Sequence, residues 1–203
     1  MKILIIQQKM IGDVLASSIL FEAIKHQYPD AELHYLINTH TFPVVDQNPY
    51  IDKIHFFTPE HEKSKLKLIK FAKQLRKENY DVIIDVYSKL SSNLITLLSK
   101  AKIKISKYKP YTSFIYNHTY KDANKVISKA GLAIENRLQL LIPLGIDISN
   151  IVRPKIYLTE EEKSKIKVFL ESNRIDTSKP LYMIGVLGSG PNKTYPFDYM
   201  ASV

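Results

Sequence analysis

The sequence contains no cysteine and no tryptophan, only 6 glycines among its 203 residues, and no long uninterrupted apolar run. The missing cysteines exclude disulfides, thiolate catalysis and cysteine-based zinc sites. A membrane-spanning helix needs about 18 or more apolar residues in succession, and "MKILIIQQK" at the start is too short for a signal-peptide core. We therefore expect a folded cytoplasmic protein, because 45% hydrophobic residues, 13 Tyr and 8 Phe suffice for a core.

Positive charge is concentrated in one part of the chain. The formal net charge is +9, and residues 60–110 hold 13 Lys or Arg against 5 Asp or Glu, which gives that part a net charge of +8. Such a patch suits an anionic partner, although it is also compatible with a solvated lysine-rich helix face. RNA-binding aromatic motifs and a helix-turn-helix pattern are absent, so we do not expect a nucleic acid as the partner.

Strand-like and helix-like stretches alternate along the first half of the chain. Helices are predicted over 12–27, 60–79 and 89–99 because apolar residues recur at helical spacing there. This alternation indicates a doubly wound parallel α/β sheet with strand order 3-2-1-4-5, which binds ligands at the carboxyl ends of its strands beside strand 1. The predicted strands are 2–6, 32–37, 53–57, 81–86 and 102–106.

The second half of the chain has weaker signals. Residues 107–122 are polar and aromatic, so they predict a surface loop, and 123–145 predict a helix in which Gly131 is a weak point and Gly145 the stop. Thr159 and Glu162 have the spacing of a capping box, which predicts a helix to about residue 173. We expect an N-terminal lobe over 1–150, a linker with its helix over 151–180, and the start of a second, incomplete α/β lobe over 181–203.

Gly12 and Asp13 follow the first strand at a strand-to-helix turn, where such sheets present residues to ligands. The Asp13 carboxylate could cap the helix by accepting backbone N–H groups, or it could act as a general base. Position alone favours the cap. Asp85, near the carboxyl end of the fourth predicted strand, could face the ligand cleft, but we expect it to have a structural role.

A second candidate site is "GSGPNKT", residues 188–194. Backbone N–H groups of a glycine turn before a helix can bind phosphate, and Lys193 adds a charge. A P-loop would need glycine at 192 and a dinucleotide fingerprint would need it at 193, so both motifs fail and a plain surface turn remains an alternative. The six histidines show no metal-binding spacing, and no metal site is expected.

Several segments, taken in order, resemble the family 9 glycosyltransferases, which include the heptosyltransferases of bacterial lipopolysaccharide core assembly. The resemblance runs from residue 1 to 203. It rests on the segments "IGDVLASSILFEAIKHQYPDAELHYLI", "NPYIDKIHFF", "YDVIIDVYSKLSSNLITLLSKAKIKIS", "ENRLQLLIPLGI" and "GSGPNKTYPFDYMA".

The resemblance implies a GT-B architecture, in which the N-terminal lobe receives the acceptor and the C-terminal lobe holds a nucleotide sugar. It implies inverting transfer of heptose from ADP-heptose to a lipopolysaccharide inner-core acceptor, with no cofactor and no catalytic metal. Asp13 then corresponds to the general base beside Gly12, while Lys193, with Ser189 and Thr194, would contact the diphosphate. The anionic glycolipid acceptor and the cytoplasmic face of a Gram-negative inner membrane are the implied partners of the basic patch.

Departures from the family pattern limit these expectations. Gln7 stands where the family often has Arg, and Tyr195 where it often has Trp. Most of the nucleotide-binding lobe is missing, so we expect the 203 residues alone to transfer sugar poorly. A truncated, non-catalytic acceptor-binding module therefore remains an alternative. A dehydrogenase is disfavoured, because no glycine fingerprint follows the first strand.

Overall fold

The computed structural model describes residues 1–149, 153–182 and 194, and these form two compact units, Met1–Tyr157 and Leu158–Val203. The first unit contains a six-stranded sheet of order β3-β2-β1-β4-β5-β6 in which all neighbouring strands run parallel. The predicted doubly wound α/β sheet is thereby confirmed, including the order 3-2-1-4-5. The strands are β1 (Lys2–Ile6), β2 (Glu32–Asn38), β3 (Lys53–Phe57), β4 (Val82–Asp85), β5 (Ile103–Lys107) and β6 (His118–Tyr120).

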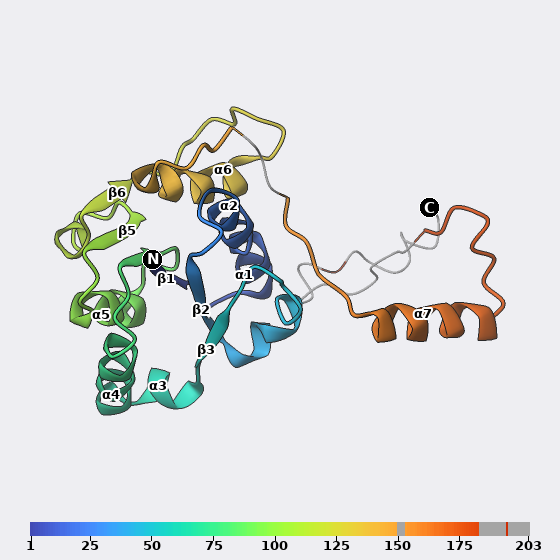
Figure 1. Cartoon of the computed structure of the whole chain (residues 1–203), viewed down its shortest axis with the longest axis horizontal. Helices are drawn as coiled ribbons and strands as arrows, with labels where there is room; N and C mark the ends of the chain where they lie inside the picture. The colour runs from blue at the N-terminus through green and yellow to red at the C-terminus, as the bar shows by residue number, and fades with distance from the viewer. Residues whose placement is uncertain (150–152, 183–193, 195–203) are drawn as a thin grey trace. The chain divides into compact units, whose positions relative to one another are not determined.

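Helices cover both faces of this sheet (Figure 1). They form because each stretch between strands carries apolar residues at helical spacing. The helices of the first unit are α1 (Ile11–Ser17), α2 (Ile19–Gln27), α3 (Pro59–Lys63), α4 (Lys65–Arg76), α5 (Leu90–Leu98), α6 (Leu132–Leu138) and the 3-10 helices η1 (Thr39–Val44), η2 (Ser113–Ile115) and η3 (Gln139–Leu144).

The alternation of side chains along each strand creates two cores. Ile3 and Ile5 of β1 pack in the cluster beneath α1, α2 and η3, whereas Leu4 and Ile6 pack in the cluster beneath α4 and α5. This division follows from the two-residue period of a strand, which points successive side chains to opposite faces. The central strands are buried on both faces, which fixes their register and hence the position of the residues that follow them.

Two predictions about the second half of the first unit are wrong. Residues 107–122 are not a surface loop, because they contain η2 and β6, and β6 pairs with β5 through Ile105–His118 and Lys107–Tyr120. The 123–145 helix is also shorter than predicted, since only α6 and η3 are helical. Gly131, with φ of +82°, precedes α6 instead of interrupting it, and Gly145, with φ of +69°, ends η3 as expected.

The second unit is described over part of its length. Helix α7 (Glu160–Ser172) begins at the predicted capping box, in which Thr159 Oγ1 accepts the Glu162 N–H at 3.1 Å and Glu162 accepts the Thr159 N–H at 2.8 Å. The predicted strand and turn over 181–193 lie outside the described residues, apart from 181 and 182. None of the described helices is long and apolar enough to cross a membrane.

A buried histidine network lies at the amino ends of the strands. Glu32 accepts from His34 Nε2 at 2.8 Å, and the Tyr80 hydroxyl lies 2.8 Å from His34 Nδ1 and 2.9 Å from His55 Nε2. All these hydrogen bonds are satisfied when both imidazoles are neutral. Burial, which disfavours the charged imidazole, lowers the pKa of His34 despite Glu32, and lowers the pKa of His55 to about 4.

This network predicts loss of stability in mild acid. The folded pKa of His55 lies below its unfolded value, so the unfolded chain binds more protons between pH 6.5 and about 4. The contribution of His55 to the free energy of unfolding is therefore fully present above pH 6.5. As the pH drops towards 4, the free energy of unfolding falls by about 2 kcal/mol. Urea unfolding at a series of pH values measures this slope. His55→Gln should reduce the slope above pH ~5.5, where Glu residues contribute little, and His34 should account for the part that remains. His40→Gln, at an exposed position, is the control and should leave the slope unchanged.

Candidate functional site

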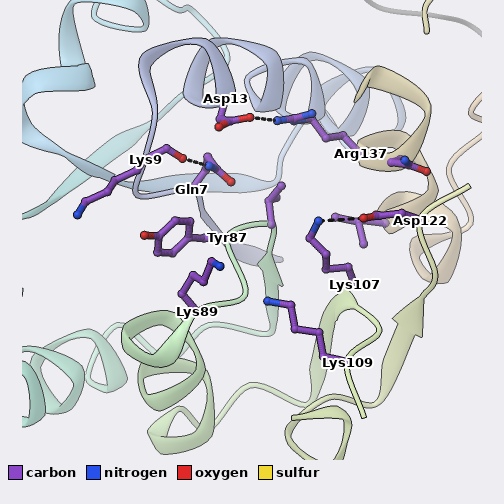
Figure 2. Close-up of a pocket in the computed structure, with 12 residues that line it drawn as sticks. Gln7, Lys9, Asp13, Tyr87, Lys89, Lys107, Lys109, Asp122 and Arg137 are labelled. Atoms are coloured by element: carbon purple, nitrogen blue, oxygen red, sulfur yellow. Dashed lines mark hydrogen bonds and ion pairs between the residues drawn. The ribbon is translucent and has the colours of Figure 1, made fainter. Parts of the chain in front are cut away.

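A cavity of about 360 Å³ opens at the carboxyl ends of β1, β4 and β5. Gln7 follows β1 in the chain, Tyr87 and Lys89 follow β4, and Lys109 follows β5. The cavity thus lies beside the point between β1 and β4 where the strand order reverses, which is where doubly wound sheets bind ligands. Figure 2 shows these side chains around one opening, together with Asp13 and Arg137 from the helices above the sheet.

Asp13 lies at the rim of this cavity and forms an ion pair with Arg137. Arg137 Nη2 donates to Asp13 Oδ1 at 2.7 Å, while its Nε donates to Ser17 Oγ at 2.9 Å and its Nη1 to the Ala133 carbonyl at 2.6 Å. The guanidinium is thus held by three partners from two helices. Because the Arg137 side chain is only 13% exposed and that of Asp13 is 49% exposed, a fixed cation orients a carboxylate that solvent or a ligand can still reach.

The two sequence-based roles of Asp13 are compatible in one side chain. Asp13 is the third residue of α1, and its Oδ2 accepts the Met10 N–H at 3.4 Å. This distance exceeds the 2.7–3.2 Å typical of N–H···O bonds, so capping contributes little. The stronger contact is the one with Arg137, and it leaves the carboxylate at the cavity edge. The catalytic role of Asp13 stays a prediction.

Positive charge dominates the cavity. Five cationic side chains and two carboxylates line it, Lys9, Lys89, Lys107, Lys109 and Arg137 against Asp13 and Asp122. Lys107 pairs with Asp122 at 3.1 Å, and Lys9 with Glu62 at 2.6 Å. Within the described parts of the chain the Lys89 ammonium has no ionic partner, so the cavity retains uncompensated positive charge.

Lys109 is a half-buried lysine of this cavity. Its ammonium donates to the Ser88 carbonyl, and burial, followed by repulsion from Lys89 and Lys107, lowers its pKa. A ligand that brings negative charge to this point would relieve the repulsion. The chemistry of the cavity therefore favours phosphate or carboxylate groups.

The turn that carries Tyr87 and Lys89 is held by Asp85. The buried Asp85 carboxylate accepts the Ser88 N–H at 2.7 Å and the Tyr116 hydroxyl at 2.6 Å. Ser88 adopts φ of +48°, a left-handed conformation that needs this anchoring because Ser rarely adopts it. Asp85 is fully buried and is not among the residues that line the cavity, which agrees with the expected structural role. Burial raises its pKa.

The other residues predicted for the site are only partly described. Gly12 is exposed, and a Cβ added there would meet no atom within 4 Å, so open space lies beside Asp13. Ser189 and Lys193 lie outside the described residues, and Thr194 is described as a bend in the second unit. Within residues 1–149, 153–182 and 194, no group of three His, Asp or Glu is arranged to hold a metal ion.

Arg137, Tyr87 and the cavity lysines were not singled out from the sequence as site residues. Tyr87 and Lys89 could have been found from their position directly after a buried strand. Arg137 could not, because 124 residues separate it from Asp13 and no local pattern links them.

Comparison with known proteins gives one consistent result. The model of glycosyltransferase family 9, described as heptosyltransferase, matches residues 68–203. Lipopolysaccharide heptosyltransferase 3 of Escherichia coli is 28% identical over 140 residues, which cover 67% of this chain and 41% of that protein.

Solved structures agree with this match. A family 9 glycosyl transferase from Veillonella parvula superposes with a TM-score of 0.83 and 18% identity, covering 99% of this chain and 58% of that one. An E. coli heptosyltransferase with ADP-2-deoxy-2-fluoro heptose gives a TM-score of 0.71 and 18% identity, covering 100% of this chain and 64% of that one. The fold is thus of the GT-B type that was predicted, and the chain spans less than two thirds of the length of each of these proteins.

Proposed function

Because the chain belongs to glycosyltransferase family 9, we propose that it forms the acceptor-binding part of an enzyme that transfers heptose from ADP-heptose to a lipopolysaccharide inner-core acceptor. One observation carries this proposal. A carboxylate, Asp13, oriented by Arg137, stands at the edge of a cationic cavity at the switch point of the sheet. That is the arrangement that deprotonation of a hydroxyl on an anionic acceptor requires.

The acceptor would be bound by charge. Lys89 and Lys109 face the cavity and can pair with phosphate or carboxylate groups of the inner core. Gln7, where the family often has Arg, donates its amide to the Lys9 carbonyl and adds no charge. In this chain the lysines that follow β4 and β5 would therefore bind the anionic groups of the acceptor in place of an arginine after β1.

The proposed reaction is a single displacement. Asp13 accepts the proton of the acceptor hydroxyl while the hydroxyl oxygen forms a bond to the anomeric carbon of the heptose. The bond from that carbon to the diphosphate oxygen breaks on the opposite side, which inverts the anomeric centre and releases ADP. Lys193, with Ser189 and Thr194, would stabilise the charge that grows on the diphosphate, and no metal would take part.

The donor assignment draws on a relative. The E. coli heptosyltransferase was solved with an ADP-heptose analogue, and its fold matches this chain over the whole length. One observation favours a second function, acceptor binding alone, because every residue that lines the cavity belongs to the unit Met1–Tyr157. That unit could bind an acceptor without transferring sugar. Because the acceptor is linked to lipid, either function would bring the chain to the membrane surface.

The test joins this chain to a complete nucleotide-binding lobe and supplies ADP-heptose with a delipidated inner-core oligosaccharide. We expect mass spectrometry to detect an oligosaccharide heavier by one heptose. The 203-residue chain alone should bind the same oligosaccharide in calorimetry without transferring sugar. Binding with no transfer by the joined protein would leave only the acceptor-binding module, and no binding at low salt would contradict both functions.

A further inference from the structure

A second groove, of about 400 Å³, lies between α5 and residues 111–115. Four large apolar side chains around it are exposed to solvent, with exposed fractions of 82% for Leu90, 48% for Leu97, 72% for Tyr111 and 77% for Phe114. We refer to these four residues as the α5 apolar patch. Single exposed apolar residues are common on protein surfaces, but a group of this kind around one groove marks an interaction site.

The patch is not the outer side of an ordinary amphipathic helix. Helix α5 packs Ile95 into the core, but it also buries the polar residues Ser92, Asn93 and Thr96. At the same time it exposes Leu90 and Leu97. In a helix that meets water on its outer side, the polar residues would lie outside. The outer side of α5 instead carries two exposed leucines, which indicates that this side meets an apolar environment.

The charge around the patch indicates which partner the patch binds. Ser88 and Lys89 line the groove, Lys89 also lines the cationic cavity, and none of the described residues lining the groove is acidic. Helix α4 packs beside α5 and exposes Lys70 and Lys73, for which the described parts of the chain provide no carboxylate partner. A protein partner would have to supply both apolar and acidic groups, whereas a bilayer with anionic lipids supplies both everywhere.

We propose that the α5 apolar patch docks on an anionic lipid bilayer, with Tyr111 and Phe114 entering the headgroup region and the neighbouring lysines contacting lipid phosphates. Aromatic rings are preferred at this depth of a membrane. The groove and the cationic cavity share Lys89, so docking brings the cavity to the membrane surface. This proposal deepens the proposed function, on which it rests, by stating how the site reaches an acceptor that is linked to lipid.

Vesicle sedimentation with the full 203-residue chain tests the docking. The vesicles consist of phosphatidylglycerol and phosphatidylethanolamine, or of phosphatidylcholine alone, and contain no glycolipid. We expect binding to the anionic vesicles that added salt weakens, and little binding to phosphatidylcholine. Tyr111→Ser with Phe114→Ser should lower the partition coefficient by about tenfold, because two apolar side chains no longer enter the membrane.

The matched control is Ile127→Ser, since Ile127 is 88% exposed but lies in the segment before α6 and outside the patch. It should bind vesicles as the unchanged chain does. Equal binding by the patch variant and the control would overturn the proposal, and so would absence of binding to anionic vesicles. Sedimentation velocity without lipid tests for self-association. If the unchanged chain is a dimer and the patch variant is a monomer, the patch instead binds a second copy of the chain. Transfer to a delipidated acceptor needs no membrane, so failure of docking and failure of the proposed function remain distinguishable.

Discussion

Replacing Asp13 by Asn lowers kcat by about a thousandfold in a protein that joins this chain to a complete nucleotide-binding lobe. General-base catalysis contributes about 10²- to 10⁴-fold, and an amide of the same shape cannot accept the proton of the acceptor hydroxyl. Folding should be nearly unaffected. The ion pair with Arg137 involves a half-exposed carboxylate, and such pairs stabilise proteins by about 1 kcal/mol or less. Initial rates with ADP-heptose and urea unfolding of the same preparations measure both quantities.

Asp122→Asn is the matched control, because Asp122 is the other carboxylate of the cavity and pairs with Lys107. It should change kcat by no more than a few-fold. Arg137→Met should fall between the two variants, since the base remains but its orientation by Nη2 is lost. Turnover by Asp13→Asn at the level of the unchanged protein would remove the base from the mechanism, and an equal loss in Asp122→Asn would indicate a charge effect.

The sheet could be predicted from the sequence because each of its buried strands has a local sequence pattern. Buried parallel strands appear as short apolar runs, and the five predicted strands agree with β1 to β5 within one residue at each end. The strand order followed from the alternation of strands and helices. Strand β6 escaped prediction, since "HTY" is three polar or amphipathic residues whose strand identity comes from pairing with β5. The helix predicted over 123–145 failed for a related reason, as Gly131 turns the chain into α6 with a positive φ.

The features of the candidate site also fall into two groups, those that a local sequence pattern predicts and those that depend on long-range packing. The position of Asp13 at a strand-to-helix turn is a local feature, and the cavity lies where the topology rule places it. The contact between Asp13 and Arg137 is not local, because it depends on how α6 packs beside α1. The convergence of Lys89 and Lys109 depends likewise on two successive strands ending at the same edge. The charges that surround Asp13 in the cavity are therefore brought together by long-range packing, which cannot be predicted from local patterns in one sequence.

Asp85→Ala should lower the free energy of unfolding by about 3 kcal/mol, a large effect for the loss of a single polar side chain. Asp85 lies at 0% exposure, and its carboxylate satisfies the Ser88 N–H and the Tyr116 hydroxyl. Tyr116 keeps a second partner in Asn93 Oδ1 at 2.7 Å, but the Ser88 N–H would be left buried without an acceptor. Urea denaturation followed by circular dichroism measures the loss.

Asp85→Asn separates the hydrogen bonds from the charge. Burial raises the pKa of Asp85, so the folded protein gains little from its negative charge, and an amide oxygen can still accept the Ser88 N–H. We therefore expect Asp85→Asn to cost about 1 kcal/mol or less. Ser88→Gly should be neutral, because glycine adopts φ of +48° without strain. If Asp85→Asn were as damaging as Asp85→Ala, the charge itself, through Lys109, would hold the turn that presents Tyr87 and Lys89 to the cavity.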